Sequence, residues 1–358
     1  MINVTKTYLP DLESYKAQLE GIWERAWLTN NGPLVQELES KLRAHLGVEQ
    51  LYAYSNGTIV LQFALKVLNI SGEVITTPFS YVATTNALIW HNCKPVFVDI
   101  DPQTYCIDPE LIEAAITEKT TAIMATHVYG NACDVEKIEA IAKKHNLKVI
   151  YDAAHTFGVK YKGQSLLNHG DVSTLSFHAT KVFHTVEGGA IVSPHLHLKE
   201  ELELLRAFGH RGDEYYKMVG INGKLSEFHA AMGLCMLPQV DELIAKRKVL
   251  SDLYDANLDY SKLSQPTFVA GLERNYAYYP TVFQSETQLR TVFAALNQHQ
   301  IQPRRYFYPS LNTLPFFDTK HDCPISENIS PRAAALPLYP ELEPETVLKI
   351  CELVNAAL

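Results

Sequence analysis

The sequence predicts an α/β protein with two domains. Over residues 1–240 we expect a large α/β domain whose central, mostly parallel sheet is flanked by helices, and over residues 241–358 a smaller α+β domain. Two observations lead to this prediction. Short β-rich runs alternate with helical patterns through the first two thirds of the chain, which is typical of βαβ units. After about Val240 the alternation stops, and a long helical pattern is followed by aromatic, strand-like pieces.

The elements of the large domain are expected from apolar spacing and length. Helical spacing runs from Leu34 to Leu42, a short strand from Leu51 to Tyr54, and an amphipathic helix from Ile59 to Leu68. Further strands are predicted at Glu73 to Thr76, Pro95 to Asp99, Ala122 to His127 and Lys148 to Asp152, with helices at Tyr81 to His91, Pro109 to Thr117 and Asp134 to His145. In the small domain we expect helices at Glu242 to Leu258 and Glu343 to Ala357, around a strand within Asn275 to Phe283.

Composition excludes several classes of protein. Hydrophobic residues make up 47% of the 358 residues and charged residues 20%, so the chain is neither mainly disordered nor fibrous. The net charge of −9, from 31 basic and 40 acidic side chains, disfavours a nucleic-acid partner. No secretory signal or membrane-length apolar run is apparent, so we expect no membrane association. The six cysteines are scattered without a Cys-x-x-Cys pair, which favours free thiols in the cytoplasm over a metal site.

The segment Asn56-Gly57-Thr58 lies between a predicted strand and a predicted helix. A glycine there allows a tight turn, so that amides at the helix N-terminus face an anion and the Thr58 hydroxyl adds a further donor. An ordinary turn with a helix N-cap has the same pattern. No GxGxxG follows a strand, so the nicotinamide dinucleotide fingerprint is missing.

Two later segments carry candidate catalytic groups. Asp152 ends an apolar strand, where open α/β sheets bind ligands, and its charge could keep a heteroaromatic nitrogen protonated. A helix N-cap is the alternative reading of Asp152. Ser176 and Lys181 leave another predicted strand, and a lysine held in a partly buried pocket loses proton affinity and becomes an imine-forming nucleophile. A solvated surface lysine is the alternative for Lys181.

Together these segments resemble a known family. The order SNGT, PFSYVAT, VYGNACD, YDAAH, SFHATK, EGGA and GINGKLSEFHAAMG is similar to the fold type I, pyridoxal-phosphate-dependent sugar aminotransferases of the DegT/StrS family. The resemblance extends from WLTNNGP to LPLYP, nearly the whole chain. Within the family, WLTNNGP and RRYFYPSLN most resemble the enzymes that make 4-amino-4,6-dideoxyhexoses on a thymidine diphosphate carrier.

The resemblance implies a role for each matching residue. Lys181 would form the internal aldimine with pyridoxal phosphate, and Asp152 would pair with the pyridinium nitrogen. Tyr81 would stack on the ring, beside which His155 stands where many relatives carry Gln. The phosphate would be held by Gly57, Thr58, Ser176 and, from a neighbouring subunit, Asn222. A homodimer with shared sites is therefore implied.

The resemblance also implies the reaction. We expect ping-pong transfer of an amine from L-glutamate to a dTDP-4-keto-6-deoxyhexose, with C3 transamination as the alternative. Lys181, in place of the His of some sugar dehydratases, favours transamination. Candidate substrate contacts are His184, Arg305, Tyr306 and Tyr308. A non-catalytic regulator with the same fold is a more distant alternative, disfavoured by the presence of Lys181, Asp152 and Ser176.

Overall fold

A seven-stranded sheet forms the centre of the molecule in the computed structural model, which describes residues 1–212, 214–317 and 321–358. Across the sheet the strands follow the order β2-β10-β9-β6-β5-β3-β4, and β10 alone in this sheet runs antiparallel to its neighbours. The expected mostly parallel sheet is confirmed. In that order the strands are Leu51–Tyr54, Gly189–Val192, Val172–Ser176, Lys148–Asp152, Thr120–Thr126, Glu73–Thr76 and Lys94–Phe97.

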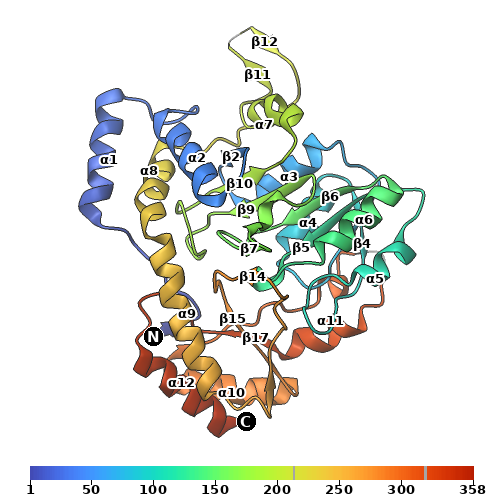
Figure 1. Ribbon diagram of the computed structural model, residues 1–358, viewed down its shortest axis with the longest axis vertical. Coiled ribbons are helices and arrows are strands. Elements are labelled where there is room, and N and C mark those ends of the chain that lie inside the picture. Colours follow the sequence, from blue (N-terminus) through green and yellow to red (C-terminus); the bar gives the residue numbers. More distant parts are fainter. Residues whose placement is uncertain (213, 318–320) are drawn as a thin grey trace.

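Helices cover both faces of this sheet (Figure 1). On one face, residues such as Leu51 and Ala53 of β2 pack with α2 and α8, and Val149 and Tyr151 of β6 pack with α6. The intervening Tyr52 and Tyr54 point to the other face, where α3, α4 and α7 lie. These helices are α2 Pro33–Leu46, α3 Gly57–Val67, α4 Ala83–Trp90, α6 Val135–His145, α7 Lys199–Leu205 and α8 Glu227–Met236.

The C-terminal part of the chain builds a second, three-stranded antiparallel sheet. Its strands β13, β15 and β17 are Leu263–Ser264, Tyr279–Phe283 and Ala333–Leu336, and they pack with α9 Val240–Asn257, α10 Glu286–Gln298 and α12 Pro344–Ala357. Strand β1, Ile2–Asn3, pairs with β16, Ile301–Gln302, so the first residues of the chain lie with this part (Figure 1). The division at residue 240 stays a prediction.

Smaller elements complete the structure. Helix α1 is Leu12–Arg25, α5 is Pro109–Ile112 and α11 is Pro324–Ile329. Strand β7, Lys160–Tyr161, lies between β8, Gln164–Ser165, and β14, Leu272–Glu273. The antiparallel pair β11, His210–Arg211, and β12, Tyr215–Tyr216, projects from the body at the top of Figure 1. No helix among the described residues is long and apolar enough to cross a membrane.

Two predicted elements are only about half as long as expected. The helix predicted over Pro109 to Thr117 ends at Ile112 and continues only as one 3₁₀ turn, because the amide of Thr117 donates to Thr120 Oγ1, 2.9 Å away. The strand predicted within Asn275 to Phe283 begins at Tyr279. The side chain of Asn275 instead donates to the carbonyls of His155 and Phe157, at 2.8 and 3.0 Å, and ties the two parts of the chain together.

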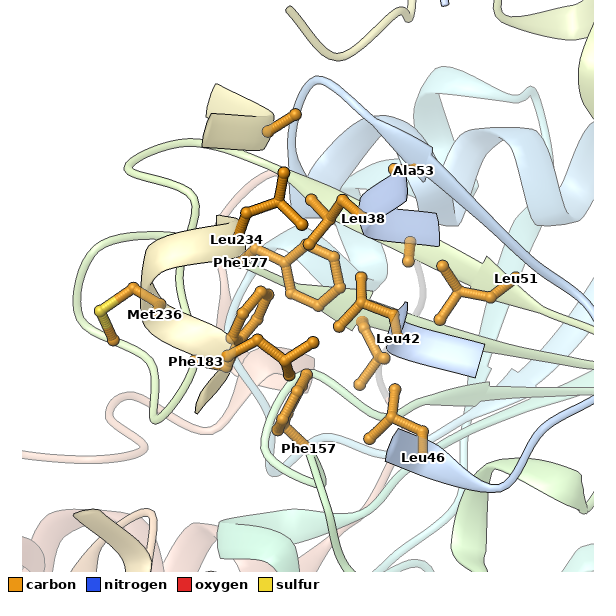
Figure 2. Close-up of a cluster of buried hydrophobic side chains, with 14 of the residues drawn as sticks. Leu38, Leu42, Leu46, Leu51, Ala53, Phe157, Phe177, Phe183, Leu234 and Met236 are labelled. Atoms are coloured by element: carbon orange, nitrogen blue, oxygen red, sulfur yellow. The ribbon is translucent and has the colours of Figure 1, made fainter. Parts of the chain in front are cut away.

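An aromatic cluster anchors the loops that follow two of the central strands, β6 and β9. Figure 2 shows Phe157, Phe177 and Phe183 among leucines of α2. The rings of Phe157 and Phe183 stack at 4.5 Å, and Phe177 meets Phe183 edge-on at 4.9 Å. Because these residues stand one or two positions after Ser176, Lys181 and His155, burial of their rings fixes the backbone beside those polar side chains.

Candidate active site

A cavity of about 710 Å³ opens at the carboxyl ends of the parallel strands. Thr126 and Asp152, which end β5 and β6, lie side by side in register, and Ser176 ends β9 beyond them. Open α/β sheets bind ligands at this edge. The cavity lining contains all the predicted cofactor contacts except Asn222: Gly57, Thr58, Tyr81, Asp152, His155, Ser176 and Lys181.

Lys181 lies in the tight loop between β9 and β10. Its amide donates to the carbonyl of His178 at 2.9 Å, and the amide of Thr185 closes the loop on Phe177 O at 2.9 Å. The Nζ atom donates to the phenol oxygen of Tyr278, 3.5 Å away. Burial lowers the pKa of Lys181, while the charge of Asp152 acts in the opposite direction. The amine is thereby brought closer to the neutral, nucleophilic form.

Asp152 is 6% exposed, and both of its carboxylate oxygens have protein donors. Oδ1 accepts from the amide of Ala154 at 3.1 Å, and Oδ2 accepts from the hydroxyl of Thr84 at 2.6 Å. Burial raises the pKa of Asp152, whereas these two hydrogen bonds and the charge of Lys181 lower it. The carboxylate is thus held in one orientation at the floor of the cavity.

The N-terminus of α3 contributes to the lining of the cavity. Asn56 caps it, because its Oδ1 accepts from the amides of Thr58 and Ile59 at 3.0 and 2.9 Å. A Cβ atom on Gly57 would lie only 2.8 Å from Cβ and Oγ of Ser176, so only glycine allows the helix to approach β9 so closely. The positive end of the helix therefore lies beside Ser176, and Gly57, Thr58 and Ser176 all line the cavity.

His155 enters the cavity as a neutral, partly unsatisfied ring. It stacks on Phe307 at 5.7 Å and meets the edge of Tyr278 at 4.8 Å. Burial holds the pKa of His155 well below its usual value. Among the described residues its buried Nδ1 has no hydrogen-bond partner. A bound molecule with a hydrogen-bonding group would satisfy this nitrogen.

Of the four predicted substrate contacts, Tyr306 lines the cavity. Arg305 lies outside the lining, because its guanidinium pairs with Glu286 at 3.2 Å and donates to Pro331 O at 2.8 Å, over the ring of Tyr308. His184 is buried elsewhere, with Nε2 2.7 Å from the carbonyl of Tyr8.

The predicted partner-subunit contact, Asn222, also lies outside this chain's cavity lining. It is exposed, and its Oδ1 accepts from Lys224 at 2.7 Å.

The predicted site residues did not include several that line the cavity or support it, among them Arg304, Tyr278, Ser80, Thr84 and Thr126. Arg304 is directly next to Arg305, and spacing alone does not tell which of two adjacent arginines faces a ligand. Ser80 and Thr84 lie within the segment PFSYVAT, on either side of Tyr81, so the motif contained their signal. Tyr278 comes from the C-terminal part of the chain, far from the motifs in sequence.

Comparison with known proteins gives a consistent result. The chain is 44% identical over 347 residues to the dTDP-4-amino-4,6-dideoxy-D-glucose transaminase of Shigella dysenteriae, covering 95% of each chain. It is 39% identical over 372 residues to the Escherichia coli enzyme of the same name, covering 99% of this chain and 98% of that enzyme. The crystal structure of DesI with its TDP-sugar product superimposes with a TM-score of 0.94 at 29% identity, covering 99% of this chain and 92% of DesI.

The family model for the DegT/DnrJ/EryC1/StrS aminotransferase family matches residues 11–355, nearly the whole length of the sequence. The expected fold type I architecture is confirmed by these neighbours and by the sheet described above. The chain therefore belongs to the DegT/DnrJ/EryC1/StrS aminotransferase family, whose enzymes depend on pyridoxal phosphate.

Proposed function

We propose that this aminotransferase moves an amino group from L-glutamate to C4 of a dTDP-4-keto-6-deoxyhexose, giving a dTDP-4-amino-4,6-dideoxyhexose of the viosamine type. The observation that carries the proposal is the meeting of Lys181 and Asp152 in one cavity at the strand ends. The two dTDP-4-amino-4,6-dideoxy-D-glucose transaminases, at 44% and 39% identity over nearly the full chain, support the substrate.

The residues of the cavity fit the cofactor. The capped N-terminus of α3, Gly57, Thr58 and Ser176 suit a phosphate, since the missing Cβ of Gly57 leaves the close approach that an anion cradle needs. Asp152 suits a protonated ring nitrogen, the unpartnered Nδ1 of His155 suits a polar ring substituent, and Tyr81 suits the face of the ring. Lys181 would hold the cofactor covalently.

The cofactor, when bound, supplies an electron sink for the carbanion that forms at the donor carbon. The chain supplies orientation and proton transfer. When its amine is free, Lys181 would take the proton from the donor carbon and deliver it to a second carbon on the same face of the reacting system. Its lowered pKa places this amine nearer the working pH range. Asp152 keeps the ring nitrogen positively charged, because a buried carboxylate stabilises a cation placed beside it.

Arg304 is proposed to bind the carboxylate next to the reacting carbon of the donor. Arg304 lines the cavity, and its guanidinium lies 4.7 Å from the ring centre of Tyr306. Burial raises the pKa of both Tyr306 and Tyr278, and the charge of Arg304 opposes that rise. Tyr278 contacts Lys181 directly, so Arg304 acts close to the reacting amine. The diphosphate of a sugar nucleotide is separated from C4 by the hexose ring and would lie farther away.

We further propose a cytoplasmic homodimer in which Asn222 reaches the partner's cavity. The position of Asn222 outside its own cavity supports this arrangement. All six cysteines are free thiols, which supports a reducing compartment.

The visible absorbance spectrum of the purified protein with pyridoxal phosphate tests the proposal, before and after L-glutamate is added. A yellow band that bleaches, and returns with dTDP-4-keto-6-deoxyglucose, is expected. NMR of the product should place the new amine at C4; an amine at C3 would establish the alternative regiochemistry instead. Lys181→Ala should lose both the yellow band and turnover, and turnover retained by this variant would contradict the assignment of Lys181.

A further inference from the structure

Behind Asp152 lies a chain of three buried hydroxyl groups. Thr84 Oγ1 donates to Asp152 Oδ2 at 2.6 Å, Ser80 Oγ lies 2.7 Å from Thr84 Oγ1, and Thr126 Oγ1 donates to Ser80 Oγ at 3.1 Å. Ser80, Thr84 and Thr126 are at most 3% exposed. These hydrogen-bonded hydroxyls connect the end of β5 to the end of β6 through the first turn of α4. No step of the mechanism described above uses these three hydroxyls.

The direction of this chain follows from counting protons. Each hydroxyl has one proton to donate. With Asp152 ionised, the proton of Thr84 is committed to the carboxylate, so Ser80 must donate to Thr84, and Thr126 in turn donates to Ser80. All three O–H bonds then point toward Asp152, and hydrogen bonds aligned in this way strengthen one another.

Two further features act in the same direction. Thr84 lies in the first turn of α4, where the amide dipoles favour a nearby anion. The amide of Ala154 holds the other carboxylate oxygen, at 3.1 Å. The titratable groups around the carboxylate are Lys181, from the loop after β9, and His155, three residues further along the chain from Asp152.

We propose that Thr84 is a positioning residue for the aminotransferase reaction, whose hydroxyl, oriented by Ser80 and Thr126, keeps the Asp152 carboxylate ionised and aimed at a cationic heteroaromatic nitrogen in the cavity. The proposal rests on the role of Asp152 given under Proposed function. A purely structural Thr84, which only ties α4 to the sheet, would have no effect on the ionisation of Asp152.

The test therefore measures that ionisation directly, in the protein without cofactor. The carbonyl stretch of the protonated Asp152 carboxyl group is followed by infrared spectroscopy against pH and assigned by its loss in Asp152→Asn. In Thr84→Val the midpoint of this titration should rise by about one to two pH units, as expected for loss of one hydrogen bond to a charged group. Thr84→Ser should restore the midpoint. Affinity for pyridoxal phosphate at neutral pH should follow the same order, about 10- to 100-fold weaker in Thr84→Val.

Thr85→Val is the matched control. Thr85 is the next residue of α4, is equally buried, and its hydroxyl donates to Val82 O at 3.2 Å rather than to Asp152. Its titration should match that of the wild type. An unchanged midpoint in folded Thr84→Val, or an equal shift in Thr85→Val, would overturn the proposal.

If Thr84→Val does not fold, the same infrared titration of Ser80→Ala tests the proposal. This variant removes the donor to Thr84 and the acceptor of Thr126, but leaves the hydrogen bond from Thr84 to Asp152 in place. It should give a smaller upward shift of the Asp152 midpoint, and no shift would contradict the proposed role of the three hydroxyls. Because the infrared titration uses the protein without cofactor, its outcome is independent of whether the proposed substrates react.

Discussion

Burial shifts the pKa values of Lys181 and Asp152 in opposite directions. Burial disfavours both charged forms, so it lowers the pKa of the lysine and raises that of the aspartate, and each group then limits the shift of the other by its own charge. The lysine is released toward its neutral form, while hydrogen bonds from Thr84 and Ala154 oppose protonation of the aspartate. Burial thus favours the neutral form of both groups, while their mutual attraction and the hydrogen bonds to Asp152 favour the charged forms.

Arg304 is expected to determine the affinity for the amino donor. Arg304→Gln removes the charge proposed to bind the donor carboxylate, so the KM for L-glutamate should rise about 10- to 100-fold, with partial recovery in Arg304→Lys. Rapid-mixing absorbance spectroscopy measures the glutamate and keto-sugar half-reactions separately.

Arg290→Gln is the control for this experiment. Arg290 lies on α10, is exposed, and pairs with Glu286 at 2.7 Å. The rates of both half-reactions in Arg290→Gln should match those of the wild type. If Arg304→Gln slows only the keto-sugar half-reaction, Arg304 contacts the sugar nucleotide and not the donor.

At the residue scale, the motifs predicted residues that the structure gathers at one cavity, but not which neighbouring side chains packing would add to the cavity or keep out of it. Lys181, Asp152, Gly57 and Ser176 belong to motifs that signal their positions, and the structure places them around one cavity. Arg304 and Arg305 are chemically equivalent in the sequence. Only the pairing of Arg305 with Glu286 and Pro331 distinguishes them, and that pairing depends on tertiary contacts with α10.

At the scale of elements, the close approach of α3 to β9 at Gly57 and Ser176 shapes the proposed phosphate site. Gly57→Ala would place a methyl group 2.8 Å from Ser176, so α3 must move away from the strand. Affinity for pyridoxal phosphate should fall by about one to two orders of magnitude, as for other overpacked contacts. Fluorescence titration of the protein without cofactor measures it.

Gly47→Asn serves as the comparison for this substitution. Gly47 ends α2 in a left-handed conformation at φ 64°, which Asn tolerates, and no atom lies within 4 Å of a Cβ there. Cofactor affinity should be unchanged in Gly47→Asn. An affinity equal to wild type in folded Gly57→Ala would show that the phosphate is not held at this junction.

The bounds of helices and strands were predicted best where the apolar pattern of the sequence matches the burial of the segment in the fold. The strands Glu73–Thr76 and Lys148–Asp152 have the predicted bounds, because both are short apolar runs buried within the sheet. The segment after Ile112 differs, since Thr120 captures the amide of Thr117 and stops the helix. The spacing of apolar residues contains no information about such a contact.

At the scale of the whole molecule, buried neutral histidines link stability to pH. His127 is fully buried, stacks on Tyr151 at 4.5 Å, and its Nδ1 accepts from the amide of Cys133 at 3.1 Å. Burial lowers the pKa of His127 to about 3. Between about pH 6.5 and pH 3 the unfolded chain therefore binds a proton that the folded chain does not, and the free energy of unfolding falls as the pH falls.

His127→Phe tests this linkage, because phenylalanine keeps the stacking and cannot be protonated. The variant should be less stable than wild type at pH 7, where the amide of Cys133 loses its acceptor. Its stability should also depend less on pH, by up to about 1.4 kcal/mol per pH unit between pH 6.5 and 3. Urea unfolding at a series of pH values measures both effects. Parallel pH dependences of variant and wild type would show that His127 does not titrate on unfolding.

The largest-scale prediction concerns the proposed sharing of sites between two subunits. Apolar side chains near Asn222 are exposed on this chain, among them Val219 at 77%, Tyr216 at 67% and Ile221 at 46%. Exposed apolar residues gathered in one segment are typical of an interface. Lys181→Ala and Asn222→Asp should each be nearly inactive, the second because it brings a negative charge to the cofactor phosphate. The pairing of residue 222 with Lys224 can persist in Asn222→Asp, which favours an intact fold.

Co-expression of these two variants with different affinity tags decides whether the sites are shared. In a hybrid dimer with shared sites, the Asn222→Asp subunit supplies an intact Lys181 and its partner supplies an intact Asn222, so one of the two cavities is complete. Hybrid dimers purified through both tags should therefore regain activity that neither variant has alone. If each cavity used its own Asn222, both cavities of the hybrid would carry a defect, and no activity would return. Sedimentation at the assay concentration confirms that the hybrid is a dimer, so that an inactive hybrid counts against sharing rather than against assembly.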